Sequence, residues 1–163
     1  YNINYKGINM NDIDKKLQNL GITLPDAPMP AANYIPYVIT GKLVFISGQV
    51  PFENGVIKHK GKVGKDIDIE QAKLIAKTCA LNVISVLKNA LNGDLSKVNK
   101  CVKLGIFVSC TTDFDQQPEV ANGASDLMVA IFGDKGKHAR FAVGTNSLPK
   151  NVPVEVDAIF EIY

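Results

Sequence analysis

The chain has 163 residues, of which 46% are hydrophobic and 21% are charged, as expected for one soluble globular domain with a substantial core. Its formal net charge of +2 and the absence of a dense basic run argue against a nucleic-acid surface, and no apolar run is long enough to span a membrane. Three cysteines without a CxxC pair argue against a disulfide framework or a zinc site, and they favour a reducing, cytoplasmic setting, with an organelle as the alternative.

The N-terminal part of the chain is predicted to be an arm with one short helix. Prolines between residues 24 and 36 exclude regular structure after this helix. We therefore assign residues 1–33 to an N-terminal extension and arm, and residues 34–163 to the main domain. The helix is indicated by apolar residues on one helical face, followed by glycine as a natural C′ residue: Ile13, Leu17, Leu20 and Gly21.

A hairpin and a long helix are predicted to follow the arm. Two β-rich runs flank Gly41, and the second run, residues 43–50, is apolar at nearly every position, which favours a strand covered on both faces. Residues 51–57 have turn chemistry with room for a short strand. Asp68 and Gln71 then form a capping-box pattern at the start of the helix. Apolar residues at intervals of three and four mark its buried face: Ala72, Ile75, Ala76, Cys79, Ala80, Val83, Ile84 and Leu87.

Residues 113–134 have the pattern of a second helix. Asp115 can cap its start, Pro118 suits an early position, and Gly133 ends it. Gly123 weakens the helix because glycine has low helix propensity. The buried face of this helix is marked by three residues: Val120, Leu127 and Ile131.

Three further strands are predicted around this second helix. They cover residues 100–110, residues 139–149 and residues 152–163, and the first and last of these segments alternate with period two. Glu155 and Asp157 project from one face of the last strand. The opposite, apolar face of the first strand carries Val102, Leu104, Ile106 and Val108, and that of the last strand carries Val152, Val154, Val156, Ala158, Phe160 and Ile162.

The predicted order, β-β-α-β-α-β-β, indicates an α+β fold with a mixed sheet and two helices on one face. The other face is expected to mix polar and apolar side chains. Such a face is typical of an oligomer surface, and a closed ring of subunits would bury it and leave polar residues in clefts between subunits. The residues expected on this face are Ser47, Gln49, Phe107, Glu155 and Asp157.

Several segments together resemble the Rid family, also called YjgF/RidA, whose older label is L-PSP endoribonuclease. These are "TGKLVFISGQVP", the long helix ending in "LNGDLSKVNKCVKLGIFV", and "ARFAVGTNSLPKNVPVEVDAIFEI". In the last of them, Arg140, Pro149 and Glu155 keep the family's R-x8-P-x5-E spacing. The similarity covers residues 34–162, and the long arm with "ANYIPY" indicates a longer subgroup.

The resemblance implies a fold, an assembly and an activity. The fold is chorismate-mutase-like, and the assembly is a homotrimer with the sheets in an inner barrel, the helices outside and a cleft at each subunit interface. RidA-type members hydrolyse reactive 2-enamine and 2-imino acids to 2-oxo acids and ammonia, with no metal or organic cofactor. The implied partners are therefore small 2-imino and 2-oxo acids and further copies of this chain.

The resemblance also implies which residues form the site. Arg140 matches the arginine that pairs with the substrate carboxylate, for which its planar fork is suited. Glu155 matches the glutamate that holds or activates the attacking water. Ala142 stands where the family usually has cysteine, so that only its backbone is left to contact substrate. The residues that match the lining of the same cleft are Tyr37, Ser47 and Asn122.

Structural roles remain as alternatives for several of these residues. Arg140 can form an ion pair, and Glu155 can be its partner or a solvated strand residue. Asp157 is more simply structural. Ser47 can satisfy a backbone group, and Tyr37 can be a packing residue of the arm.

Two other functions also stay open. A non-catalytic binder of 2-oxo acids or a chaperone-like regulator would use the same cleft, and Ala142 and the altered arm motivate this alternative. An endoribonuclease or translation inhibitor has little support from the small net charge. The two histidines, His59 and His138, lie in loop-like stretches without a neighbour at metal spacing, so that no metal site is predicted.

Overall fold

The structure is a computed structural model that describes residues 12–27 and 33–163. The predicted extension before residue 12 and part of the predicted arm lie outside the described residues. The described part of the chain forms three α-helices, and none of them has both the length and the apolar character needed to cross a membrane. The helices are α1 (Asp12–Asn19), α2 (Ile69–Ala90) and α3 (Gln117–Phe132).

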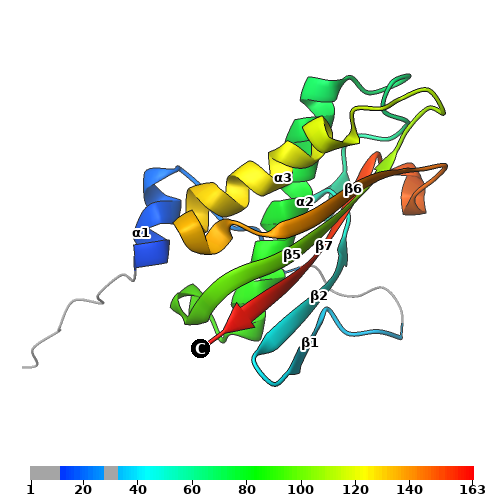
Figure 1. The fold of residues 1–163 in the computed structure, drawn as a ribbon. Coiled ribbons are helices and arrows are strands. Elements are labelled where there is room, and N and C mark those ends of the chain that lie inside the picture. The colour runs from blue at the N-terminus through cyan, green and yellow to red at the C-terminus, as the bar shows by residue number, and fades with distance from the viewer. Residues whose placement is uncertain (1–11, 28–32) are drawn as a thin grey trace, which may run out of the picture.

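A mixed five-stranded sheet has the order β1-β2-β7-β5-β6 (Figure 1). β5 and β6 run parallel, as a strand pair connected through α3 must, and the other pairs are antiparallel. The small β3–β4 hairpin lies outside this sheet, in the turn-rich segment where a short strand was predicted. The strands are β1 (Tyr37–Thr40), β2 (Leu43–Gln49), β3 (Phe52–Glu53), β4 (Val56–Ile57), β5 (Val98–Ser109), β6 (Ala139–Thr145) and β7 (Val154–Ile162).

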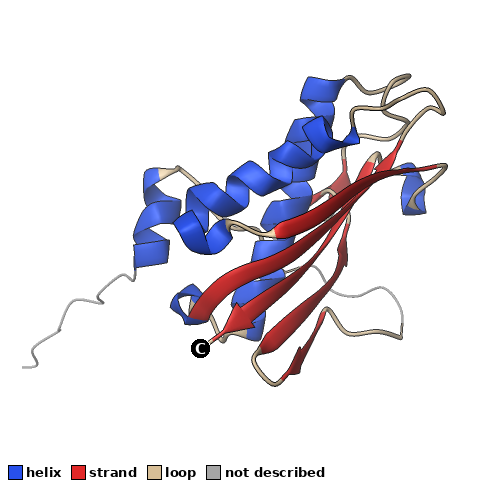
Figure 2. Cartoon of the chain, in the orientation of Figure 1, coloured by secondary structure: helices blue, strands red, loops and turns tan. Residues whose placement is uncertain are grey.

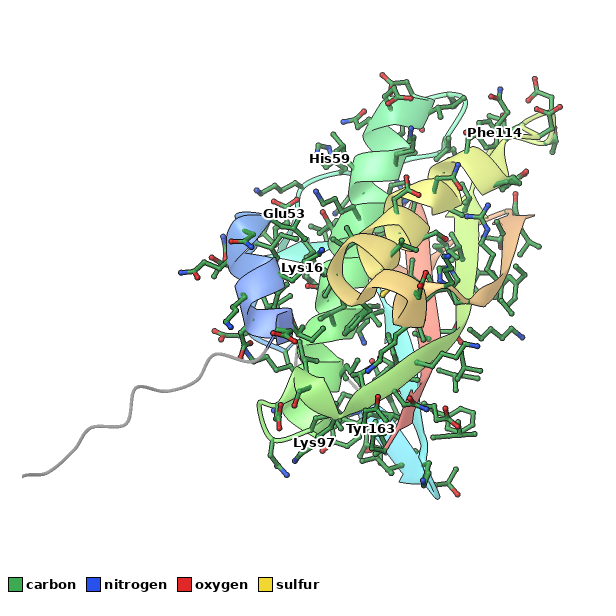
Figure 3. The ribbon with its side chains drawn as sticks, turned by 60° about the vertical axis from the view of Figure 1, so that its left-hand side comes forward. Lys16, Glu53, His59, Lys97, Phe114 and Tyr163 are labelled. Carbon is green, nitrogen blue, oxygen red and sulfur yellow. The ribbon has the colours of Figure 1, made fainter. Side chains whose placement is uncertain are left out.

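The two long helices cover one face of this sheet (Figure 2), so that the predicted β-β-α-β-α-β-β order and layer arrangement are confirmed. The long axis of the molecule runs from the Phe114 end to the end where Lys97 and Tyr163 lie (Figure 3). At that second end, the Tyr163 N–H donates to the Lys97 carbonyl at 3.2 Å. Three short 3-10 turns join the elements: η1 (Leu95–Lys97), η2 (Gly133–Gly136) and η3 (Pro149–Asn151).

The start and the buried face of α2 are as predicted. The Asp68 carboxylate accepts a hydrogen bond from the Gln71 N–H at 2.8 Å and so caps the first turn. All eight residues predicted for the buried face of this helix are at most 3% exposed. Their burial against β2 and β7 forms the centre of the core.

The start of α3 differs from the prediction. The helix begins after Gln116, which makes no side-chain capping bond, so that Asp115 precedes the cap position and does not cap the helix. Pro118 in the first turn needs no N–H partner there, and Gly133, at a φ of +60°, ends the helix as predicted. Val120, Leu127 and Ile131 are buried, as predicted.

Gly123 explains how closely α3 packs on α2. A Cβ at this position would lie 1.9 Å from the carbonyl oxygen of Lys73 in α2, so the side chain must be absent for the helices to approach. The low helix propensity of glycine is thus offset by tertiary packing.

Two details of the predicted strands are wrong. A bulge between Cys101 and Lys103 shifts the alternation of β5, so that Cys101 is buried and Val102 is only half-buried. β2 is covered on one face alone in the single chain, because no helix reaches the face that carries Phe45. The predicted apolar face of β7 is buried from Val154 to Phe160, whereas its last member, Ile162, is half-buried.

The face of the sheet opposite the helices is covered by no element among the described residues. We call it the open face. The edge-to-face pair of Phe107 and Phe141, with ring centroids 5.2 Å apart, lies on it. The open face comprises the side chains that alternate with the core residues: Val38, Phe45, Lys103, Phe107, Phe141, Val143, Glu155, Asp157 and Ile159. Four of these are apolar and 38–49% exposed: Val38, Phe45, Phe107 and Val143.

Candidate functional site

Arg140, the only arginine of the chain, lies near the start of edge strand β6. It is in register with the buried Leu104 of β5, so its side chain projects from the face of the sheet that the helices cover. There it meets α3: Nη1 donates to Asn122 Oδ1 at 2.9 Å and to Ser125 Oγ at 3.0 Å, and Nη2 donates to the Pro118 carbonyl at 3.4 Å. The edge position leaves the side chain exposed although the strand around it is largely apolar.

These contacts leave one edge of the guanidinium unengaged. A guanidinium has five N–H donors, and the three contacts above use both donors of Nη1 and one of Nη2. Among the described residues, Nε and the second Nη2 donor have no partner, and all ion pairs within the described ranges involve lysines. The described residues therefore do not support the alternative that Arg140 forms an ion pair within its own chain.

Behind Arg140 lies a second layer of polar contacts. Ser125 Oγ is 2.9 Å from Nε2 of His138, and Nδ1 of the same ring is 2.6 Å from the Gly136 carbonyl oxygen. No role was predicted for Ser125, and His138 was interpreted as an isolated loop histidine. One local signal was available, because Ser125 lies three residues after Asn122 and thus on the same helical face.

Glu155 lies on the open face, in register with Phe107. Its carboxylate occupies space that Gly48 leaves free, since a Cβ at Gly48 would lie 2.2 Å from Glu155 Oε1. The pKa of Glu155 is raised, first because the carboxyl group is half-buried and second because Asp157 adds a negative charge nearby. A carboxylate with a raised pKa is a better proton acceptor at neutral pH.

Asp157, two residues after Glu155 on β7, has a similar setting. A Cβ at Gly105 would lie 2.1 Å from Asp157 Oδ1, so this glycine also makes room for a carboxylate. Partial burial raises the pKa of Asp157, although a hydrogen bond from the Gly105 backbone and the charge of Lys103 oppose the shift. The open face thus holds two neighbouring acids that are both easier to protonate than usual.

The remaining predicted residues are held by local contacts. Ser47 Oγ donates to the Ile35 carbonyl at 2.7 Å, which ties the arm to β2. Tyr37, in β1, is half-buried against the core. Ala142 also packs against the core, in register with Ile106 on the helix-covered face.

The structure brings Arg140 and Asn122 together, and it places Glu155 beside the β2 segment of Ser47. It does not bring the two groups to each other. Arg140 shares a face of the sheet with the core residue Leu104, whereas Glu155 shares the opposite face with Phe107. The side chains of Arg140 and Glu155 in one chain therefore project to opposite sides of the sheet.

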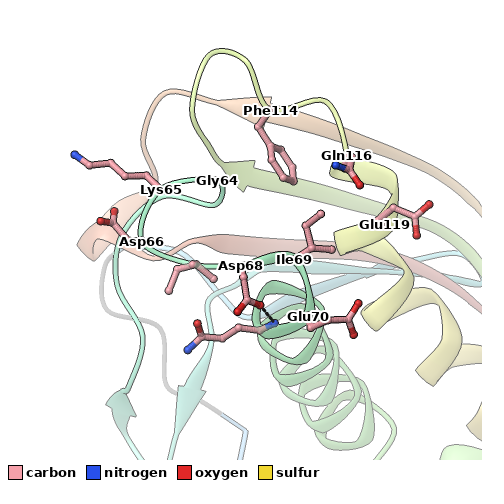
Figure 4. A pocket seen from close by; sticks show the side chains of 11 residues that line it. Gly64, Lys65, Asp66, Asp68, Ile69, Glu70, Phe114, Gln116 and Glu119 are labelled. Carbon is pink, nitrogen blue, oxygen red and sulfur yellow. Dashed lines mark hydrogen bonds between the residues drawn. The ribbon is translucent and has the colours of Figure 1, made fainter.

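A separate cavity of about 970 Å³ lies where α2 and α3 begin, and it contains none of the predicted site residues. Phe114 and Ile69 face one another across it (Figure 4). Of its acidic residues, Asp66 accepts from the Lys62 N–H and Asp68 caps α2, so both have structural partners. Within the part of the chain that the structure describes, no group of three or more His, Cys, Asp or Glu side chains is arranged to hold a metal ion.

Comparisons with known proteins give a consistent result. The family model described as "YjgF/chorismate_mutase-like, putative endoribonuclease" matches residues 14–161. The chain is 44% identical to Protein TCP17 of Trypanosoma cruzi, over 90% of this chain and 91% of that protein. It is 28% identical to a 2-iminobutanoate/2-iminopropanoate deaminase of Dermatophagoides farinae, over 86% of this chain and 94% of that one. The crystal structure of Atu1372 from Agrobacterium tumefaciens, described as of unknown function, is 48% identical and has a TM-score of 0.87, over 93% of this chain and 92% of that chain.

Proposed function

Since this chain belongs to the YjgF/RidA family and has its chorismate-mutase-like fold, as predicted, we propose that it hydrolyses 2-imino acids to 2-oxo acids and ammonia. A relative is named as a deaminase of this kind. The observation that carries the proposal is the guanidinium of Arg140, which α3 holds in place while Nε and one Nη2 donor have no partner among the described residues.

In the proposed reaction, Arg140 binds the substrate carboxylate. Nε–H and the second Nη2–H can form two parallel hydrogen bonds to the two carboxylate oxygens, a geometry that lysine cannot reproduce. Asn122, already bonded to Nη1, fixes the plane of the fork. The backbone near Ala142, two residues along β6, is the proposed contact for the imine end of the substrate.

Glu155 is the proposed base. Water adds to C2 of the imine, which forms a C–O bond, and the water proton moves to the Glu155 carboxylate. This proton returns to the nitrogen, which holds the former C=N electron pair, and gives the neutral carbinolamine. The Glu155 carboxylate then takes the hydroxyl proton and passes it to the same nitrogen as the C–N bond breaks, so that ammonia leaves and the C2 oxygen becomes the carbonyl of the 2-oxo acid. The raised pKa of Glu155 suits a group that must both accept and return a proton.

We further propose that each site is shared between two subunits of a homotrimer. Arg140 and Glu155 project from opposite faces of the sheet, so the fork of one chain would meet the carboxylate of the next. The exposed apolar side chains of the open face support an assembly that covers this face. Ser47 and Tyr37 would then line the wall that carries Glu155.

The activity is tested by generating the imine in situ with an amino-acid oxidase or a dehydratase and following ammonia release. We expect Arg140→Ala and Glu155→Gln each to lower kcat/KM by about 100-fold or more, because each removes a group that acts on the substrate or water. Arg140→Lys should recover little of the loss. Lys137→Ala, which removes a surface ion pair with Asp134, is the matched control. No acceleration by the wild-type protein, or full activity of Arg140→Ala, would refute the proposal.

The shared site has its own test. Arg140→Ala and Glu155→Gln chains are unfolded together, refolded as mixed assemblies and assayed. If each site takes the arginine from one subunit and the glutamate from another, about a quarter of the sites regain both groups. If both groups act within one chain, mixing restores nothing.

A second candidate function is binding of 2-oxo acids without turnover. It is favoured by Ala142, which supplies no reactive side chain where relatives carry cysteine. It predicts that calorimetry detects 2-oxo acid binding that Arg140→Ala abolishes, while imine hydrolysis stays at the uncatalysed rate. The endoribonuclease in the family description is tested with nuclease-free protein, and RNA cleavage that persists in Arg140→Ala would support a separate activity.

A further inference from the structure

We infer that Ser125 and His138 are positioning residues that hold Arg140 through a hydrogen-bond relay of fixed proton order. The inference rests on the proposed function, because it assigns these residues to the carboxylate-binding side of the same site. The relay runs from the Gly136 carbonyl through His138 and Ser125 to Nη1 of Arg140, with contacts of 2.6, 2.9 and 3.0 Å.

The two ends of the relay determine the direction of every bond in it. The Gly136 carbonyl can only accept, so the proton of a neutral His138 ring lies on Nδ1. Nε2 is then an acceptor, and the Ser125 hydroxyl donates to it. The remaining lone pairs of Ser125 Oγ accept from Arg140, which can only donate. Every donor in the relay therefore meets an acceptor.

The base of the relay is held rigidly on α3. Gly136, in η2, is buried, and a Cβ there would lie 2.1 Å from the Met128 carbonyl oxygen. This close approach fixes the Gly136 carbonyl and, two residues later, the ring of His138. The relay thus connects α3 to the start of β6 through His138, two residues before Arg140.

This arrangement matters because Arg140 is an exposed residue of an edge strand. A long side chain in such a place loses considerable rotamer freedom when it binds a carboxylate. Ser125, together with Asn122 and Pro118, orders the guanidinium before the substrate arrives. Ser125 and His138 should therefore govern the affinity for the substrate carboxylate and have little effect on the chemical step.

The expected result is a separation of KM from kcat. Ser125→Ala should raise KM for the 2-imino acid and the Kd for pyruvate, a stable 2-oxo acid, by about tenfold, with kcat changed less than about threefold. Ser125→Thr keeps the hydroxyl and should restore both constants. Ser85→Ala, which removes a hydroxyl bonded to the Leu81 carbonyl on α2, is the matched control and should leave both constants unchanged.

The proton order is tested directly by nitrogen-15 NMR of the histidine rings at a pH where they are neutral. The signals of His138 should be those of the Nδ1–H tautomer, and a His59→Gln variant removes the only other histidine from the spectrum. An Nε2–H tautomer at His138 would overturn the relay, whatever the activity of the protein. This measurement uses the unaltered relay and so does not depend on whether Ser125→Ala folds.

The outcomes separate this inference from the proposed function. If Arg140→Ala abolishes pyruvate binding but Ser125→Ala leaves KM and Kd unchanged, the relay is refuted and the proposed function stands. If wild-type protein neither hydrolyses imines nor binds 2-oxo acids, the proposed function fails, and the positioning role for that substrate fails with it. A tenfold loss of affinity in Ser125→Ala, rescued by threonine, supports the inference.

Discussion

The two faces of the sheet hold their charged groups in different ways. On the helix-covered side, Arg140 enters a network in which Asn122, Ser125 and the Pro118 carbonyl are all acceptors. On the open face, Glu155 and Asp157 lie near one another among apolar side chains, and burial raises the pKa of each. Arg140 is thus ordered by contacts within its own chain, whereas the charged forms of Glu155 and Asp157 are destabilised in the single chain.

This difference indicates which part of the proposed site depends on assembly. The network around Arg140 needs only α3, η2 and β6 of its own chain. The carboxylates lie on a face that no described element of the chain covers, next to Phe107 and Val143. A second chain that covers this face would lower the hydration of Glu155 further and bring it to a foreign Arg140.

The largest expected effect comes from breaking the open face. Phe107→Glu places a third carboxylate beside Glu155 and Asp157, on a side chain that is 38% exposed in the single chain. Like charges and a lost aromatic contact should convert the proposed trimer to monomers, as light scattering coupled to gel filtration would show. Activity should fall to the uncatalysed rate although the Arg140 network is untouched.

The matched control for this change is Leu74→Glu. Leu74 is 65% exposed on the helix side of the molecule, so the same substitution there should leave mass and activity unchanged. A Phe107→Glu protein that keeps the wild-type mass would show that the open face is not an assembly surface.

The next effect tests the helix-covered side. Gly123→Ala adds a Cβ 1.9 Å from the Lys73 carbonyl oxygen, and backbone cannot move away as a flexible side chain can. We expect the free energy of unfolding to fall by about 3 kcal/mol, the upper range for overpacked cores. Gly133→Ala is the comparison, since no atom lies within 4 Å of its Cβ, but its φ of +60° and ψ of −134° form a backbone conformation that alanine rarely adopts. It should lose about 1–3 kcal/mol through backbone strain alone.

Denaturant unfolding of both glycine variants gives the comparison. A loss below about 1 kcal/mol in Gly123→Ala would mean that α3 can shift away from α2 at little cost. In that case α3, which carries the residues that order Arg140, would shift easily. The affinity of Gly123→Ala for 2-oxo acids should then fall, because these residues move.

Local patterns predicted most of the fold but not the tertiary details of the site. The period of α2 and the Asp68 cap are local properties, and both are confirmed. The misplaced cap at Asp115 and the bulge before Lys103 depend on where neighbouring strands and helices hold the chain, which no short window contains. The same limit applies to Gly123, whose local effect on a helix is unfavourable and whose packing partner lies on another element.

The prediction of the site residues was limited in the same way. Arg140 and Glu155 were selected through a spacing that resembles a family, and Asn122 proved to be bonded to Arg140. Ser125 and His138 were missed because hydroxyl and imidazole groups become a relay only when η2 folds back on α3. The opposite orientation of Arg140 and Glu155 follows from strand register, which alternation within each strand cannot give.

The smallest expected effect sharpens the acidic side alone. Asp157→Asn removes a negative charge near Glu155 and keeps an oxygen that can accept from the Gly105 backbone. The pKa of Glu155 should fall, although burial, the larger cause of its rise, remains. The acidic limb of the pH profile of kcat/KM should therefore move to lower pH, with little change in the plateau. Glu161→Gln, on the same face of β7 but bonded to Asn99, is the control and should leave that limb in place.

Stability should change in the matching direction. A carboxyl group whose folded pKa is raised contributes stability below its unfolded pKa, and this contribution is lost as pH rises through the folded pKa. The wild-type protein should accordingly gain stability relative to Asp157→Asn as pH falls from neutral through the pKa values of the two acids, and Asp157→Asn should be the more stable protein at neutral pH. If the acidic limb of Asp157→Asn coincides with that of wild type, then Asp157 does not influence Glu155. Its charge would then be neutralised by a group that another subunit brings to the open face.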